Sequence, residues 1–329
     1  MSQLRLNPLT GRWVTVSTER AERPSAFAAR SLAVEHDAAR PCPFCPGNEE
    51  ETTPALETYG PEGQWLVRVV ANRYPAFYGR EALAATNLGP VFTQAPASGI
   101  HEVLVLSPEH GSSWADLSDK QAGLVMAALR DRFEEHSGVD GVRYTQAIVN
   151  HGREAGASIE HPHGQLLGIP FVPGEIVDEE AGFARFVGGC LMCTTLEAEV
   201  ELGHRTVHQD DLAVVVAPFW SGTPYELLVI PRAHEAHLHR AKPADVVAVG
   251  RALRSTLARL RTLLGDVAYN LVIHTSPHRH DGQFHWHAHV LPKVTTHAGF
   301  ELGTGVLINI IPPELAARQL AEVSARAAG

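Results

Sequence analysis

The chain has 329 residues, of which 44% are hydrophobic and 19% charged, with a formal net charge of −10. These values are typical of a soluble globular protein of about two domains. The negative balance argues against broad binding to nucleic acid polymers or anionic membranes. No apolar run reaches the roughly 18 residues of a membrane-spanning helix. The first residues, MSQLR, carry no apolar signal core, so we expect a cytoplasmic protein.

The first half of the chain predicts several strands, one helix and long loops. The helix should begin at the capping residues 116–119 and continue to about His136, because apolar residues recur there at helical spacing. Stretches rich in Pro, Gly and Ala predict loops at 31–62 and 80–100. Strands are expected at 13–16, 65–70, 101–106 and 144–149.

The second half repeats this order. A helix is expected at 243–264, and strands are expected at 212–217, 225–230, 269–274 and 284–291. His110 and His161 are 51 residues apart, and so are His234 and His285. We therefore interpret the chain as an internal duplication with units at 1–180 and 181–329. The expected class is α+β, in which two tandem units have mostly antiparallel sheets with helices packed on one face.

All four cysteines lie in two Cys-x-x-Cys pairs, and each pair precedes two histidines at equivalent positions. In a cytosolic protein such pairs indicate metal ligands or redox motifs before disulfides. Four nitrogen and sulfur ligands form a closed, structural zinc site. The alternative in each half is a pair of reduced cysteines near unrelated histidines. The predicted ligand sets are Cys42, Cys45, His110 and His161 in the first half, and Cys190, Cys193, His234 and His285 in the second.

The second half also contains surplus ligands. Glu179, His274, His287 and His289 could form a separate histidine–carboxylate site suited to iron or zinc. Several of them could instead be substrate ligands or hydrogen-bonded core residues.

The stretch His161-Pro-His163-Gly-Gln165 concentrates polar side chains at alternate positions. In an extended strand these three side chains would share one face. If zinc takes His161, then His163 is free to act as a nucleophile toward phosphorus, and Gln165 can donate to a phosphoryl oxygen. The alternatives are a polar edge strand with chance histidines, or a core histidine bonded to a carbonyl.

Other residues are suited to phosphate binding. The segment 150–158 supplies small residues, among them Gly156, and backbone N–H groups that permit close approach of a phosphate. Arg20, Arg23 and Arg73 are candidates for charge-assisted contacts, and each could equally be a solvated surface arginine.

These motifs together resemble the galactose-1-phosphate uridylyltransferase family, a branch of the histidine-triad superfamily. The resemblance covers most of the chain and rests on Trp13-Val-Thr-Val16, Arg20-Ala-Glu-Arg23, Cys42-Pro-Phe-Cys45, Ser107-Pro-Glu-His110 and residues 150–165. It implies two histidine-triad-like units, bound zinc and a ping-pong reaction. His163 would take a nucleoside monophosphate, most simply UMP, from a nucleotide sugar and pass it to a hexose 1-phosphate.

The resemblance also implies roles for individual residues. Gln165 and Ser158 would contact the phosphates, Asn72 and Asn150 the nucleotide, and Phe300 and Glu301 the hexose. A homodimer is expected, because family sites are completed across subunits.

Two positions depart from the best-known members, which have Asp where Arg73 stands and Lys where Thr295 stands. The second Cys pair and residues 299–305 resemble a sister branch that includes ADP-glucose phosphorylase, in which phosphate is the acceptor. A histidine-triad hydrolase and a non-catalytic nucleotide-binding protein are further alternatives.

Overall fold

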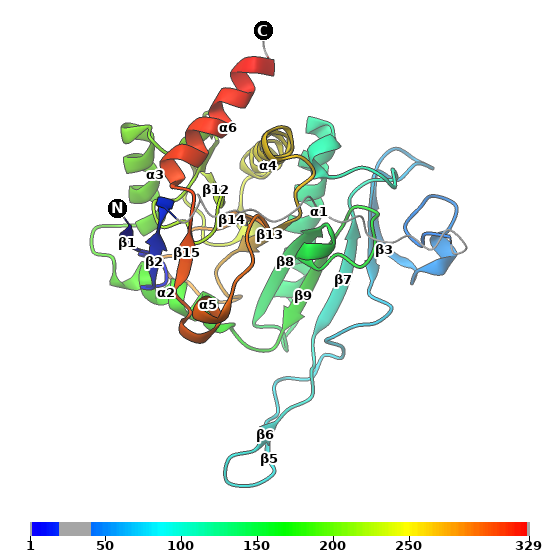
Figure 1. Cartoon of the computed structure of the whole chain (residues 1–329). Helices are drawn as coiled ribbons and strands as arrows, with labels where there is room; N and C mark the ends of the chain where they lie inside the picture. Colours follow the sequence, from blue (N-terminus) through cyan, green and yellow to red (C-terminus); the bar gives the residue numbers. More distant parts are fainter. Residues whose placement is uncertain (1, 20–40, 328–329) are drawn as a thin grey trace.

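The computed structural model describes residues 2–19 and 41–327, and within these ranges one ten-stranded sheet forms the centre of the molecule (Figure 1). Every pair of neighbouring strands in this sheet is antiparallel. The first half of the chain contributes β3 (Ala55–Tyr59), β4 (Val67–Ala71), β7 (Ile100–Val105), β8 (Tyr144–His151) and β9 (His163–Ile169). The second half contributes β10 (Thr206–Gln209), β11 (Ala213–Val216), β12 (Leu227–Pro231), β13 (Tyr269–His274) and β14 (His287–Pro292).

The two halves of the sheet have the same strand order about a central junction. The full order is β10-β11-β12-β14-β13-β8-β9-β7-β4-β3, and β13 pairs with β8 at the junction. His110 and His234 are 124 residues apart along the chain, as are His161 and His285. This arrangement agrees with the predicted duplication. The division into units 1–180 and 181–329 stays a prediction.

Two long helices, α1 (Asp119–Ser137) and α4 (Pro243–Leu264), lie side by side on one face of the sheet (Figure 1). The Ser118 hydroxyl accepts a hydrogen bond from the Gln121 N–H and caps α1, while Pro243 provides a favourable first residue for α4. A Cβ at Gly250 would lie 2.5 Å from the Ala122 carbonyl oxygen, so only glycine permits this close helix packing. The predicted α+β class, with its main helices on one face, is confirmed.

The other face of the sheet carries two helices that the sequence did not predict. α2 (Gly174–Arg185) and α3 (Leu191–Leu202) cover the β11–β12 end. A further helix, α6 (Pro313–Ala327), packs against α4 and β10 in the core of the first face. Every residue of β11 and β12 is buried, which requires apolar cover on both faces. The helices therefore extend the predicted one-face arrangement at this end of the sheet.

A small second sheet joins the two ends of the described chain. β1 (Gln3–Leu6) pairs with β2 (Trp13–Val16), and β2 pairs in parallel with β15 (Leu307–Asn309). The short helix α5 (Gly299–Thr304) directly precedes β15. The first strands of the chain thus lie beside one of its last.

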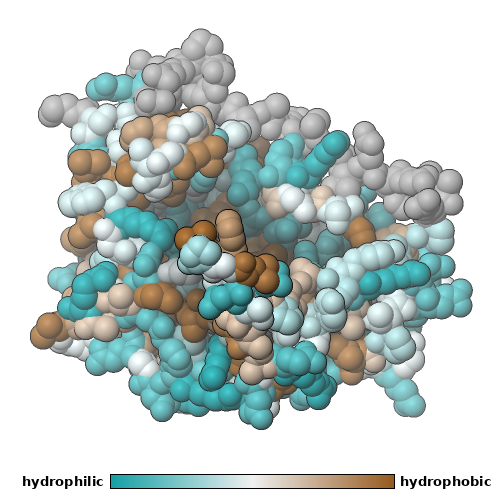
Figure 2. Space-filling view, turned by 90° about the horizontal axis from the view of Figure 1, so that it is seen from below, coloured by the Kyte–Doolittle hydropathy of each residue, from teal (hydrophilic) through white to brown (hydrophobic). Residues whose placement is uncertain are grey.

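The predicted loops at 31–62 and 80–100 are wrong in two places. β3 lies within the first because it pairs along β4, although its own residues lack a hydrophobic pattern. Within the second, β5 (Thr86–Asn87) and β6 (Thr93–Gln94) form a hairpin that projects from the body (Figure 1). Figure 2 shows the face from which this hairpin projects, where hydrophobic and hydrophilic residues are mixed. The other predicted strands and both helices agree with the structure to within three residues at each end.

In the described ranges, no helix combines the length and the apolar character that a membrane span requires.

Candidate functional site

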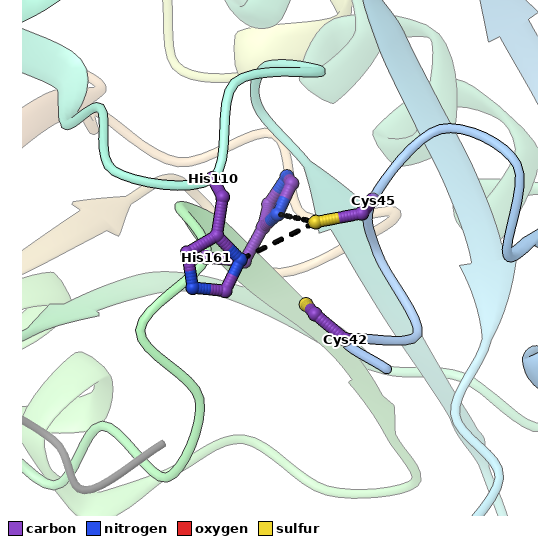
Figure 3. A group of neighbouring side chains, drawn as sticks. All are labelled: Cys42, Cys45, His110 and His161. Atoms are coloured by element: carbon purple, nitrogen blue, oxygen red, sulfur yellow. Dashed lines mark hydrogen bonds between the residues drawn. The ribbon is translucent and has the colours of Figure 1, made fainter. Parts of the chain in front are cut away.

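Four predicted ligands come together beside the start of β9. We call Cys42, Cys45, His110 and His161 the first Cys–His cluster, and their ligand atoms all lie within 4.8 Å of one another. Figure 3 shows the two cysteines on one loop facing the two histidine rings. The Cys45 Sγ lies 3.3 Å from His110 Nδ1 and 3.6 Å from His161 Nδ1. Tetrahedral zinc would place such atoms about 3.5 Å apart, so the donor set fits zinc.

The backbone fixes which nitrogen His161 presents to this cluster. Its Nε2–H donates to the Ser107 carbonyl oxygen over 2.7 Å, which leaves Nδ1 free for a metal. Burial lowers the pKa of His161 to about 4, so the ring is neutral at pH 7. His161 lies two residues before His163, the first residue of β9, and Gln165 lies within that strand.

The second half contains an equivalent group, the second Cys–His cluster, formed by Cys190, Cys193, His234 and His285. Cys193 Sγ lies 3.7 Å from His234 Nδ1 and 3.5 Å from His285 Nδ1. The Nε2–H of His285 donates to the Pro231 carbonyl oxygen over 2.9 Å. This bond repeats the one from His161, so the second cluster offers a metal the same ligand set in the same orientation.

His163 begins β9 and is held in one tautomer. Its Nδ1–H donates to the His161 carbonyl oxygen over 2.8 Å, which leaves the lone pair on Nε2. Burial lowers the pKa of His163, so the ring is neutral at pH 7. The Phe44 ring packs against it with 5.3 Å between ring centroids. A neutral, oriented imidazole of this kind is suited to nucleophilic attack.

His163 faces a cleft of about 580 Å³ between β4, β7, β9 and the cysteine loop. Five predicted site residues line this cleft, namely Asn72, Arg73, Ser158, His163 and Gln165. The cleft also contains Thr52, Thr53 and His101, which the sequence analysis did not select. His101 could have been found from its alternation with Val103 and Val105 along one predicted strand.

Asn150 lies on the other side of His163, beside a smaller hollow of about 140 Å³. Its Oδ1 accepts a hydrogen bond from Asn270 Nδ2 over 2.8 Å, and Asn270 belongs to β13 in the second half. Gly156 has φ +88°, a conformation that favours glycine, and a Cβ there would lie 3.7 Å from Asn150 Nδ2. Gly156 therefore lies next to the Asn150 amide.

Within the described residues, Phe300 and Glu301 do not line this cleft. Phe300 and Glu301 lie on α5, where Phe300 is half exposed and the Glu301 carboxylate accepts a hydrogen bond from the Ala298 N–H. Arg20 and Arg23 lie outside the described residues. Their roles stay predictions.

The surplus ligands, which are three histidines of the second half and Glu179 at the end of the first, also come together. We call Glu179, His274, His287 and His289 the histidine–glutamate cluster, whose ligand atoms lie within 4.8 Å of one another. The Nδ1–H of His287 donates to the His285 carbonyl oxygen over 2.8 Å, which leaves its Nε2 3.0 Å from His289 Nε2. Three imidazoles and a carboxylate suit iron or zinc. Three members of the cluster, but not His287, line a separate cavity of about 730 Å³.

Comparisons with known proteins find a family match and several similar proteins. A family model described as the N-terminal domain of galactose-1-phosphate uridyl transferase matches residues 1–173. A second model, described as a domain of unknown function, matches residues 115–328.

Two relatives are similar over nearly the whole chain. ADP-glucose phosphorylase from Arabidopsis thaliana is 32% identical and covers 98% of this chain and 93% of its own length. Galactose-1-phosphate uridylyltransferase from Thermotoga maritima is 28% identical and covers 98% of both chains. The crystal structure of the Arabidopsis thaliana ADP-glucose phosphorylase with bound ADP-glucose is similar, with a TM-score of 0.83, 30% identity and coverage of 98% and 99%.

Proposed function

The chain belongs to the galactose-1-phosphate uridyl transferase family, and we propose that it transfers a nucleoside monophosphate from a nucleotide sugar through a covalent intermediate on His163. One observation carries this proposal. His163, whose bonded Nδ1–H leaves the lone pair on Nε2, lines a cleft that also contains Gln165, Asn72 and Ser158. This places a neutral nucleophile beside groups that can donate hydrogen bonds to phosphate oxygens.

The proposed reaction has two displacements at the same phosphorus. The His163 Nε2 lone pair forms a bond to the α-phosphorus while the bond from that phosphorus to the bridging oxygen breaks, and a hexose 1-phosphate leaves. The leaving phosphate oxygen needs no proton, so Gln165, which cannot titrate, is sufficient at this position. The Nδ1–H bond to the His161 carbonyl stabilises the positive charge that develops on the ring. An oxygen of the acceptor phosphate then displaces the histidine.

The first Cys–His cluster would hold zinc as a structural brace. Its ligand His161 is bonded through its backbone carbonyl to the ring of His163, so a fixed His161 also fixes the nucleophile. We propose a second structural zinc in the second Cys–His cluster, and iron or zinc in the histidine–glutamate cluster.

The nucleobase and acceptor have two candidates. The first is uridylyl transfer from UDP-glucose to galactose 1-phosphate, as the family name and the Thermotoga maritima relative suggest. The second is adenylyl transfer from ADP-glucose to phosphate, which the 32% identity to ADP-glucose phosphorylase and the second Cys pair support.

We also propose that Phe300 and Glu301 reach the cleft of a partner copy in a cytoplasmic homodimer, since they do not line their own. Light scattering measures the mass of the protein in solution and therefore its oligomeric state. A monomer that retains full turnover would contradict the dimer.

A substrate panel tests the proposed function. The protein is incubated with UDP-glucose, ADP-glucose or GDP-glucose alone, and intact mass spectrometry measures the added mass. We expect one nucleoside monophosphate per chain with one of these, and peptide mapping should place it on His163. Release of sugar phosphate beyond one equivalent per chain, together with free nucleoside monophosphate, would show water as the acceptor and favour a hydrolase. Tight binding with neither adduct nor product would contradict an enzyme.

A further inference from the structure

We propose that His101 is a positioning residue that turns the N–H donors of Gln165 toward the transferred phosphoryl group. This inference rests on the proposed function, because Gln165 donates to a phosphate only if the cleft binds a nucleotide.

The strand register brings these two side chains together. In the β7–β9 pairing, His101 lies opposite Leu167 and Val103 lies opposite Gln165. Since side chains alternate along a strand, His101 and Gln165 are diagonal neighbours on the cleft face, at a distance that long side chains can span. Their terminal atoms, His101 Nε2 and Gln165 Oε1, are 2.9 Å apart.

A backbone donor determines the tautomer of His101. The Ala76 N–H donates to His101 Nδ1 over 3.0 Å, so Nδ1 is the acceptor and a neutral ring carries its proton on Nε2. The Nε2–H can then donate only to the oxygen of the Gln165 amide. Asn72 Nδ2 lies 3.1 Å from the same nitrogen, and because both groups are donors in this tautomer the contact is not a hydrogen bond.

The consequence is an amide with one orientation. With Oε1 held by His101, the Gln165 Nε2–H₂ group lies on the opposite side of the amide, in the cleft. An unheld amide could turn its carbonyl oxygen toward the phosphate and repel it. The amide of Asn150 is oriented in the same way, because its Oδ1 accepts a hydrogen bond from Asn270 Nδ2. Removing one oriented donor from such a site typically costs about 10²–10³ in rate.

Two variants separate this role from a structural one. The Asn side chain of His101→Asn can still accept a hydrogen bond from the Ala76 N–H but is too short to donate one to Gln165. The longer Gln side chain of His101→Gln can make both hydrogen bonds. We expect the first to lower kcat for nucleotidyl transfer about 10- to 100-fold with KM changed less than about threefold. The second should remain within about threefold of wild type.

A double-mutant cycle with Gln165→Leu gives the decisive comparison. If His101 acts through Gln165, then His101→Asn costs nothing further in the Gln165→Leu background. The same loss in both backgrounds would overturn the proposal.

A measurement without substrate distinguishes this inference from the proposed function. Long-range ¹H–¹⁵N NMR of histidine-labelled protein, assigned with His101→Gln, should show the Nε2-protonated tautomer. An Nδ1-protonated ring would refute the orientation of Gln165, whether or not the protein transfers nucleotides. A wild type without adduct but with the Nε2 tautomer would contradict the proposed function alone.

Discussion

The two halves of the sheet carry different chemistry at equivalent positions on the same face. His163, Gln165 and Asn150 of the first half correspond, 124 residues later, to His287, His289 and His274. The Cys–His clusters and their backbone bonds are the same in both halves. In the second half, however, Glu179 from α2 joins the three histidines and forms a potential metal site. One added helix and two changed side chains thus separate the proposed nucleotide site from the proposed metal site.

Replacing the equivalent histidines His163 and His287 should give the largest difference between the two halves. His163→Gly should abolish the covalent adduct and lower turnover by at least about 10⁴-fold, because no other group replaces the nucleophile. His287→Gly should retain the adduct. Intact mass spectrometry measures both variants, and an adduct in His163→Gly would place the nucleophile elsewhere.

The two Cys–His clusters should differ in their effect on activity. Cys42→Ser and Cys190→Ser should each remove about one zinc per chain, which elemental analysis measures. Cys42→Ser should also slow adduct formation about 10- to 100-fold, because His161 fixes His163. Cys190→Ser should mainly lower stability. Equal loss of activity in the two variants would contradict a local brace.

Two equivalent buried glutamates, Glu102 and Glu226, should respond to pH with opposite sign. Burial alone raises the pKa of Glu102, but His136 and the Arg132 guanidinium outweigh it and lower this pKa. The ionised Glu102 carboxylate therefore stabilises the fold fully at pH values above about 4.5, the pKa of this group in the unfolded chain. This stabilisation is lost as the pH falls through the lower pKa that Glu102 has in the folded protein. We expect Glu102→Gln to cost about 3 kcal/mol at pH 7, measured by urea denaturation. A cost that persists unchanged in acid would argue against the charged pair.

Among the described residues no cation pairs with Glu226, and burial raises its pKa to about 7. Its carboxyl group accepts hydrogen bonds from the Gly222 and Thr223 N–H groups. Stability is then greatest with the proton bound and falls as pH rises from about 4.5 through about 7. Glu226→Gln should gain about 1–3 kcal/mol relative to wild type between pH 5 and pH 8. The exposed Asp140→Asn variant is the control, and a gain independent of pH would indicate another cause.

Much of the candidate site follows from local spacing. The paired cysteines and the equal 51-residue intervals predicted two four-ligand groups, and the structure brings the members of each together. Asn270 could not be selected in this way, because it contacts Asn150 across a strand pairing whose register the sequence does not reveal. Alternation along its strand could have selected His101, but not its contact with Gln165 on the neighbouring strand. The sequence did not predict β3 or helix α2 for a related reason. β3 forms because it pairs with β4 at the edge of the sheet, and α2 forms because it covers the face of β11 and β12.

The parallel pairing of β2 with β15 has a consequence for synthesis on the ribosome. Residues Val14–Val16 must wait for Leu307–Asn309 to emerge before their sheet is complete. Arg5 likewise waits for Glu314, which it contacts at 2.9 Å. Closing so long a loop is slow compared with local contacts. This sheet therefore cannot be completed until β15 has been translated, and a product truncated before β15 pairs β2 with β1 alone.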